Sequence, residues 1–185
     1  MAFRAIVRTD EKQANPADYA VGTRIYSFST RHINFRHPDE FGLHEGPDGT
    51  TSNRLGLRRK LDVGTAFILS CYQHSGTQWS LMGEGMQCRF DTARVAGLLF
   101  QDGARGETHE ARVERARKFL ERYSEWCDGA VYEVELEDYD PEGEEPPYVA
   151  ASCGSLYGRS EVEAWVKEAC TERSIPSDQC LVVWK

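Results

Sequence analysis

The apolar and polar positions along this chain repeat with two periods, and they predict strands and helices in turn. Alternation over Arg24–Thr30 predicts a strand, and the apolar run Gly64–Tyr72 predicts a buried one. Residues 107–127 place apolar side chains three or four positions apart, which predicts an amphipathic helix. Further strands are expected over Phe3–Arg8, Thr77–Leu81, Val95–Phe100, Tyr148–Cys153 and Cys180–Trp184.

Short motifs mark the boundaries of the elements that follow the long helix. Asp128-Gly129 ends that helix, because glycine readily adopts the left-handed conformation found at helix ends. Ala130–Glu137 then alternates glutamate with apolar residues, which is typical of a half-buried strand. Ser160 and Glu163 have the spacing of a capping box and predict the start of a second helix.

The order of these elements favours an α+β fold. Strands, a helix, a hairpin, a second helix and a last strand predict a mainly antiparallel sheet with two amphipathic helices packed on one face. We expect a single domain over residues 1–185, with an α+β core at 61–185. Residues 1–60 would form a variable N-terminal part, and its segment 31–60, rich in glycine, proline and histidine, is expected to be irregular.

Composition narrows the class of protein. With 40% apolar and 28% charged residues in 185, the chain resembles neither collagen nor a low-complexity sequence. It lacks an apolar run long enough to span a bilayer, so no membrane association is expected. The N-terminus lacks the pattern of a signal peptide, which favours a cytoplasmic location, and the six cysteines are therefore expected to be buried free thiols.

Charge is concentrated in one segment. The net charge is −8, and residues 124–158 contain ten acidic side chains and no basic ones. A solvated face is one interpretation; the other is a surface that binds a basic partner protein. Direct binding of nucleic acid is not expected, because such a surface repels phosphates. The short basic cluster Arg54–Lys60 is interpreted as a solvated turn. The candidate binding residues are Glu133, Glu135, Glu137, Asp138, Asp140, Glu142, Glu144 and Glu145.

Four segments together resemble a family of small uncharacterised proteins from bacteriophages and mobile elements. They are Tyr72–Gly76, Cys88–Gly97, Gly129–Tyr132 and Ser152–Gly158. Members of that family have an apolar strand ending in a His-Ser-Gly turn, a Cys-x-Trp-Asp-Ser-Gly-x-Val-Gly-Phe stretch, a Gly-x-Val-Tyr-Gly strand and an Asp-Ser-Cys-Trp-Gly-Phe-Tyr-Gly turn. This chain has Phe90 in place of the tryptophan of the second motif. The resemblance covers roughly residues 64–170 and implies an origin and a fold rather than an activity.

Residues around the His-Ser-Gly turn could instead carry chemistry. Cys71 and His74 have the spacing of zinc ligands, and Cys88 could add a third. His74, Ser75 and Asp91 contain the residue types of a hydrolytic triad, but the serine does not lie in a nucleophile elbow. A small hydrolase or metal-dependent enzyme that uses Cys71, His74, Cys88 and Asp91 is therefore the alternative. We favour a protein that is not an enzyme, and expect no metal and no other cofactor.

These observations lead to one functional hypothesis. The resemblance and the acidic segment predict a phage or mobile-element accessory protein that acts in the host cytoplasm. It would bind a host protein with a basic surface, such as a nucleic-acid-binding component of a defence system, and inhibit it. Anti-restriction and anti-CRISPR proteins are of this type. Docking through charge would make the interaction sensitive to ionic strength.

Overall fold

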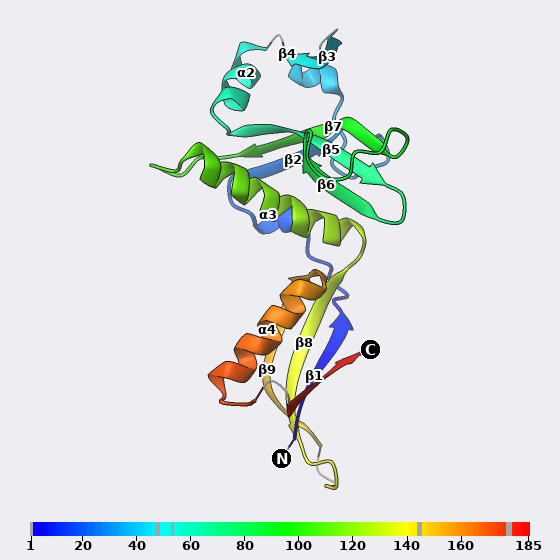
Figure 1. Cartoon of the computed structure of the whole chain (residues 1–185), viewed down its shortest axis with the longest axis vertical. Coiled ribbons are helices and arrows are strands. Elements are labelled where there is room, and N and C mark those ends of the chain that lie inside the picture. Colours follow the sequence, from blue (N-terminus) through cyan, green and yellow to red (C-terminus); the bar gives the residue numbers. More distant parts are fainter. Residues whose placement is uncertain (1, 47–48, 53, 144–145, 177–178) are drawn as a thin grey trace. The chain divides into compact units, whose positions relative to one another are not determined.

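The computed structural model describes residues 2–46, 49–52, 54–143, 146–176 and 179–185 (Figure 1). Its contacts group into two compact units: Met1–Ala14 with Glu125–Lys185 form unit 1, and Asn15–Ser124 form unit 2. Both units combine helices with mainly antiparallel sheets, so the predicted α+β class is confirmed. That the whole chain is a single domain stays a prediction.

Unit 1 is built on a four-stranded sheet that joins the two ends of the chain. The strand order is β10-β1-β8-β9, in which β1 pairs in parallel with β10 and antiparallel with β8. One helix, α4, lies across one face of this sheet (Figure 1). The bounds are β1 Ala2–Thr9, β8 Val131–Tyr139, β9 Tyr148–Tyr157, α4 Gly158–Glu172 and β10 Cys180–Trp184.

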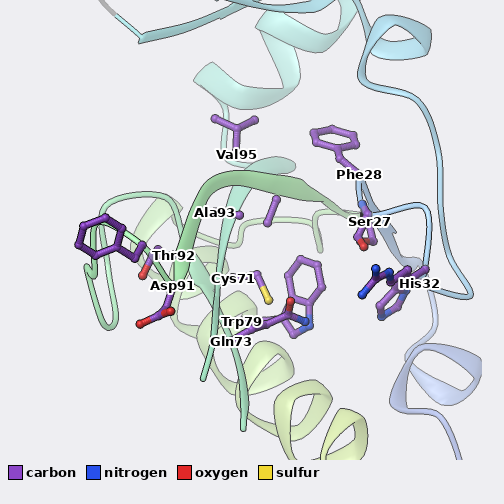
Figure 2. A pocket seen from close by; sticks show the side chains of 14 residues that line it. Ser27, Phe28, His32, Cys71, Gln73, Trp79, Asp91, Thr92, Ala93 and Val95 are labelled. Carbon is purple, nitrogen blue, oxygen red and sulfur yellow. Dashed lines mark hydrogen bonds between the residues drawn. The ribbon is translucent and has the colours of Figure 1, made fainter. Parts of the chain in front are cut away.

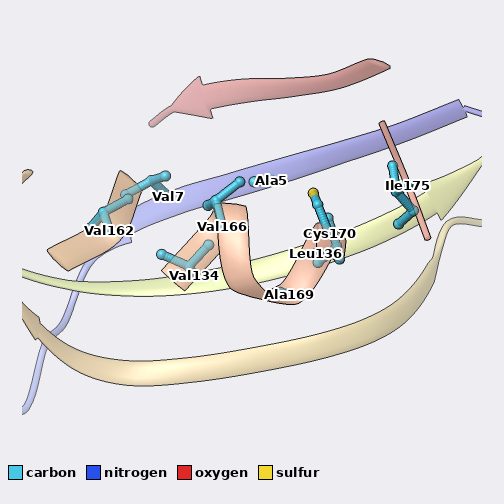
Figure 3. Packing of buried hydrophobic residues seen from close by; sticks show 9 residues of the cluster. All are labelled: Ala5, Val7, Val134, Leu136, Val162, Val166, Ala169, Cys170 and Ile175. Atoms are coloured by element: carbon cyan, nitrogen blue, oxygen red, sulfur yellow. The ribbon is translucent and has the colours of Figure 1, made fainter. Parts of the chain in front are cut away.

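The core of unit 1 explains the alternation seen in the sequence. Apolar side chains of β1 and β8 face α4, and the register pairs Ala5 with Leu136 and Val7 with Val134 (Figure 3). Because side chains alternate between the faces of a strand, this register sends the intervening charged residues to the other face. The buried cluster comprises Ala5, Val7, Val134, Leu136, Val162, Val166, Ala169, Cys170 and Ile175.

Unit 2 contains an antiparallel sheet with the strand order β2-β7-β5-β6. Helix α3 runs along one face, where the rings of Trp79 and Tyr123 meet with their centroids 6.0 Å apart (Figure 1). The Trp79 backbone N–H also donates to Ser124 Oγ at 2.8 Å. The bounds are α1 Pro16–Tyr19, β2 Thr23–Ser27, β5 Ala66–Gln73, β6 Thr77–Leu81, β7 Thr92–Gln101 and α3 His109–Cys127.

The segment expected to be irregular, 31–60, contains regular elements, so that prediction is wrong. The basic cluster is not a turn: Arg54 is the N-cap of helix α2 and the other basic residues lie on that helix, whose Leu57 and Leu61 pack into a core with Leu98 of the sheet. Helix α2 has only eight residues and includes Gly56, which obscured its apolar period. The elements are η1 Pro38–Phe41, β3 Leu43–Gly46, β4 Gly49–Ser52 and α2 Leu55–Asp62.

Two local predictions in the C-terminal part are also corrected. Helix α4 begins at Gly158, and the side chain that accepts a hydrogen bond at its start is Glu161, which bonds the Tyr157 N–H at 3.1 Å. The proposed capping pair of Ser160 and Glu163 lies inside the helix instead. The strand predicted over Tyr148–Cys153 extends to Tyr157, so the residues after Cys153, for which the family resemblance implies a turn, continue β9 and pair with β8.

The cysteines are all free thiols, as predicted. Only Cys71 and Cys170 are buried, and the other four are partly exposed, so the prediction of burial is confirmed for two of six. Among the described residues, no helix has both the length and the apolar character that crossing a bilayer requires.

Candidate functional site

The acidic strand face is partly neutralised by strand β1. Register places Arg4 opposite Glu137 and Arg8 opposite Glu133, on the face away from α4. Arg4 Nε donates to Glu137 Oε2 at 2.7 Å, and Arg8 forms an ion pair with Glu135. These partners could not be found within the segment 124–158, because they lie more than 120 positions earlier in the chain.

The three glutamates of strand β8 differ in how far their side chains are exposed. The Glu137 side chain is 12% exposed, the Glu135 side chain is 35% exposed, and Glu133 is exposed. The hydrogen bond to Glu135 raises the pKa of Arg8, and the negative charges of the strand raise it further. Desolvation of the Arg8 side chain acts in the opposite direction. Glu135 and Glu137 are therefore parts of the sheet as well as surface charges, and Glu133 is the one most open to a partner.

The remaining candidate carboxylates gather at the end of the β8–β9 hairpin. Asp138 is half-buried on β8, while Asp140 and Glu142 are exposed in the turn. Asp140 Oδ1 accepts the Glu142 N–H at 3.1 Å, so the turn is held by one of its own acidic side chains. Asp138, Asp140 and Glu142 form no ion pair with any other described residue. Glu144 and Glu145 lie outside the described residues.

An exposed aromatic residue lies beside these charges. Tyr148, the first residue of β9, pairs with Asp138 and is 73% exposed. Its neighbour Val149 is 43% exposed. Tyrosine is enriched in protein interfaces, where it combines apolar area with a polar hydroxyl group. The hairpin end therefore presents both charge and an aromatic anchor, a combination that the charge pattern of the sequence does not reveal.

A pocket of about 520 Å³ opens in unit 2 (Figure 2). Trp79 and Cys71 form its inner wall, and Asp91 and His32 lie on opposite sides of it. Two of the four residues of the alternative enzyme hypothesis, Cys71 and Asp91, thus line one cavity. Its volume is in the range of small-molecule sites in proteins.

The structure brings together three of these four residues. The Cys88 thiol donates to Asp91 Oδ2 at 3.2 Å, and His74 Nδ1 lies 3.8 Å from the same oxygen. The thiol contacts the carboxylate rather than the imidazole, so the cysteine–imidazole pair of a typical nucleophilic cysteine is not formed here. Within the described part of the chain, no group of three or more His, Cys, Asp or Glu side chains could hold a metal ion. The hydrolase alternative stays a prediction.

His32 lies in the segment that was expected to be irregular, but it belongs to a half-buried network. His32 Nδ1 accepts the Asn34 N–H at 3.1 Å, and Nε2 lies 3.2 Å from the hydroxyl group of Tyr123. Asn34 Nδ2 donates to that hydroxyl group at 3.1 Å. Burial lowers the pKa of His32, which agrees with a neutral ring whose Nδ1 is an acceptor. No spacing in the sequence links position 32 to position 123.

Comparisons with family models, with curated proteins and with solved structures find no match to this chain. The resemblance to phage and mobile-element proteins therefore stays a prediction.

Proposed function

We propose that this chain is a binding protein that docks on a basic surface of a partner protein through the end of the β8–β9 hairpin. One observation carries the proposal: Asp140 and Glu142 project from a tight turn next to the exposed ring of Tyr148. Charges of this kind speed association and select the partner, and the aromatic ring supplies contact area.

The chemistry of the hairpin end narrows the kind of partner. Basic protein surfaces of comparable charge density occur where a protein binds phosphate groups of DNA or RNA. An acidic hairpin that occupies such a surface competes with the nucleic acid. Together with the resemblance to phage and mobile-element proteins, this supports a host defence component, of the restriction or CRISPR type, as the partner. The proposed role is inhibition in the host cytoplasm without catalysis.

The ion pairs with β1 limit which glutamates can be substituted to test the proposal. Charge reversal of Glu135 or Glu137 would break contacts with Arg8 and Arg4, so a loss of binding could reflect damage to the sheet. Neutral substitutions of the two exposed carboxylates in the β8–β9 turn avoid this problem. Asp140→Asn keeps the oxygen that accepts the Glu142 N–H, and Glu142→Gln keeps the length of the side chain.

The experiment has two steps. The tagged chain is used to capture partners from host lysate at low and high salt, and the captured protein is purified. Its affinity is then measured for the wild-type chain, for the Asp140→Asn/Glu142→Gln double variant and for a control of equal charge change, Glu121→Gln/Glu168→Gln. The control residues are exposed and lie on the helices α3 and α4.

We expect the hairpin variant to bind about tenfold more weakly, with a shallower dependence on salt, because two charges that meet the partner are removed. The control should remain within about twofold of the wild type. Equal weakening in both variants would mean that only net charge matters, and unchanged binding in the hairpin variant would exclude the hairpin end as the docking surface.

A further inference from the structure

The pocket of unit 2 has aromatic walls, one of which is almost fully exposed. Trp79 at its inner wall is 4% exposed, whereas Phe90 at its rim is 88% exposed. Phe28 also lines the pocket (Figure 2), but its ring packs on Phe41, with the ring centroids 6.1 Å apart. A phenylalanine left in solvent beside a cavity gains apolar contact when a flat ligand covers it. This arrangement favours a planar ring as the occupant.

The two ends of the pocket differ in charge. Arg31 also lines it and forms no ion pair or hydrogen bond with the other described residues. The neighbouring His32 is neutral, because burial lowers its pKa, and it adds no charge at that end. At the other side, both side-chain contacts of Asp91 use Oδ2, so Oδ1 has no partner within the described part of the chain. Figure 2 shows Asp91 and His32 with the inner wall between them.

A matching ligand therefore needs three parts in order: an anionic group, a planar ring and an N–H donor on the far side of that ring. The zwitterion of a free amino acid does not satisfy this order, because its two charges lie on one carbon atom. A nucleotide does, since its phosphate and the amino group of its base lie at opposite ends. Arginine guanidinium groups bind phosphates, and carboxylates accept hydrogen bonds from base amino groups.

We propose that this pocket binds a nucleoside monophosphate with an amino-bearing base. The base stacks among the aromatic side chains, its amino group donates to Asp91 Oδ1, and its phosphate pairs with Arg31. This site lies in unit 2 and is independent of the hairpin end described above, so either proposal can fail without the other. The volume of about 520 Å³ is large enough for one such ligand.

Calorimetric titration of the full chain with four compounds tests the ligand class. CMP and AMP should bind saturably, and UMP should bind at least about fivefold more weakly, because its uracil presents a carbonyl oxygen where cytosine has an amino group. Cytidine should also bind at least about fivefold more weakly than CMP, since it lacks the phosphate. Absence of saturable binding by all four compounds at about 5 mM would overturn the proposal.

Substitutions at the two ends of the pocket test the phosphate contact and the base contact separately. Arg31→Ala should abolish the advantage of CMP over cytidine, whereas Arg36→Ala should leave it unchanged. Arg36 is a matched control, because it is exposed in the same segment and, among the described residues, its guanidinium bonds only the Phe35 carbonyl. Asp91→Asn should abolish the preference for CMP over UMP. If neither Arg31→Ala nor Asp91→Asn changes these ratios, the pocket is not the binding site.

Discussion

The ring of His32 illustrates how surroundings set the state of one residue. Its Nδ1 accepts a backbone hydrogen bond from Asn34, and its Nε2 faces the Tyr123 hydroxyl group, 3.2 Å away. A proton on Nδ1 would oppose the Asn34 N–H. Protonation of the folded chain therefore requires loss of that hydrogen bond, in addition to charging a ring that is partly removed from water.

Stability should therefore fall as the solution is acidified. Burial lowers the pKa of His32 below its ordinary value of 6.5, so the unfolded chain takes up a proton at a higher pH than the folded chain. Between these two pKa values the unfolded state binds more protons, and the free energy of unfolding falls as the pH falls below 6.5.

Urea unfolding at about pH 7.5 and about pH 5.5 measures this effect. His32→Gln, which cannot take up a proton, should reduce the difference between the two values. His74→Gln is the matched control, since that side chain is 68% exposed, and it should keep the wild-type difference. If His32→Gln and the wild type show the same difference, His32 is not the group responsible.

Helix α4 shows that the geometry of one turn decides which side chain caps an element. The backbone at Gly158 has a φ of 73°, which is a left-handed conformation that glycine tolerates well. A Cβ atom there would also lie 2.8 Å from the Glu125 carboxyl carbon. This bend begins the helix two residues before Ser160, so Glu161 accepts the hydrogen bond of the Tyr157 N–H.

Glu161→Ala should therefore cost about 0.5–2 kcal/mol of the free energy of unfolding, the range for loss of a capping hydrogen bond. Glu163→Ala should cost less than about 0.5 kcal/mol, because Glu163 is exposed and pairs with Arg159 on the helix surface. Chemical denaturation of both variants measures the difference. A larger loss for Glu163→Ala would restore the capping box expected from the sequence.

At the scale of the whole molecule, the chain path makes the two units unequal. Unit 2 is one continuous segment, Asn15–Ser124, whereas unit 1 combines both ends of the chain. Strand β1 is central in the sheet of unit 1, where it pairs with β8 on one side and β10 on the other. Its residues Ala5 and Val7 also complete the core under α4.

We expect residues 15–124 to fold alone and residues 125–185 to remain unfolded alone. The first fragment retains its complete four-stranded sheet and the core around Leu57 and Leu98. The second leaves β8 and β10 without the strand between them. Circular dichroism and amide dispersion in NMR spectra distinguish the outcomes. Cooperative folding of residues 125–185 alone would contradict the central role of β1. Addition of a peptide with the β1 sequence to this fragment tests the same role further.

Local patterns by themselves determined the α+β class, most strands, the long helix and the inward side of β8. Those features depend on neighbouring residues, whose hydrophobic period is strong in Ala130–Glu137 and over 107–127. The sequence alone also located the acidic segment. A short or interrupted hydrophobic period is too weak to identify a helix, which is why α2 was missed.

Only the tertiary structure decided how the charges and the pocket are arranged. Arg4 and Arg8 meet Glu137 and Glu135 because β1 pairs with β8, and His32 meets Tyr123 because α3 packs on the sheet of unit 2. Such contacts join positions 91 to 133 residues apart. No local pattern specifies them, because strand register and helix packing are set by burial summed over a whole core.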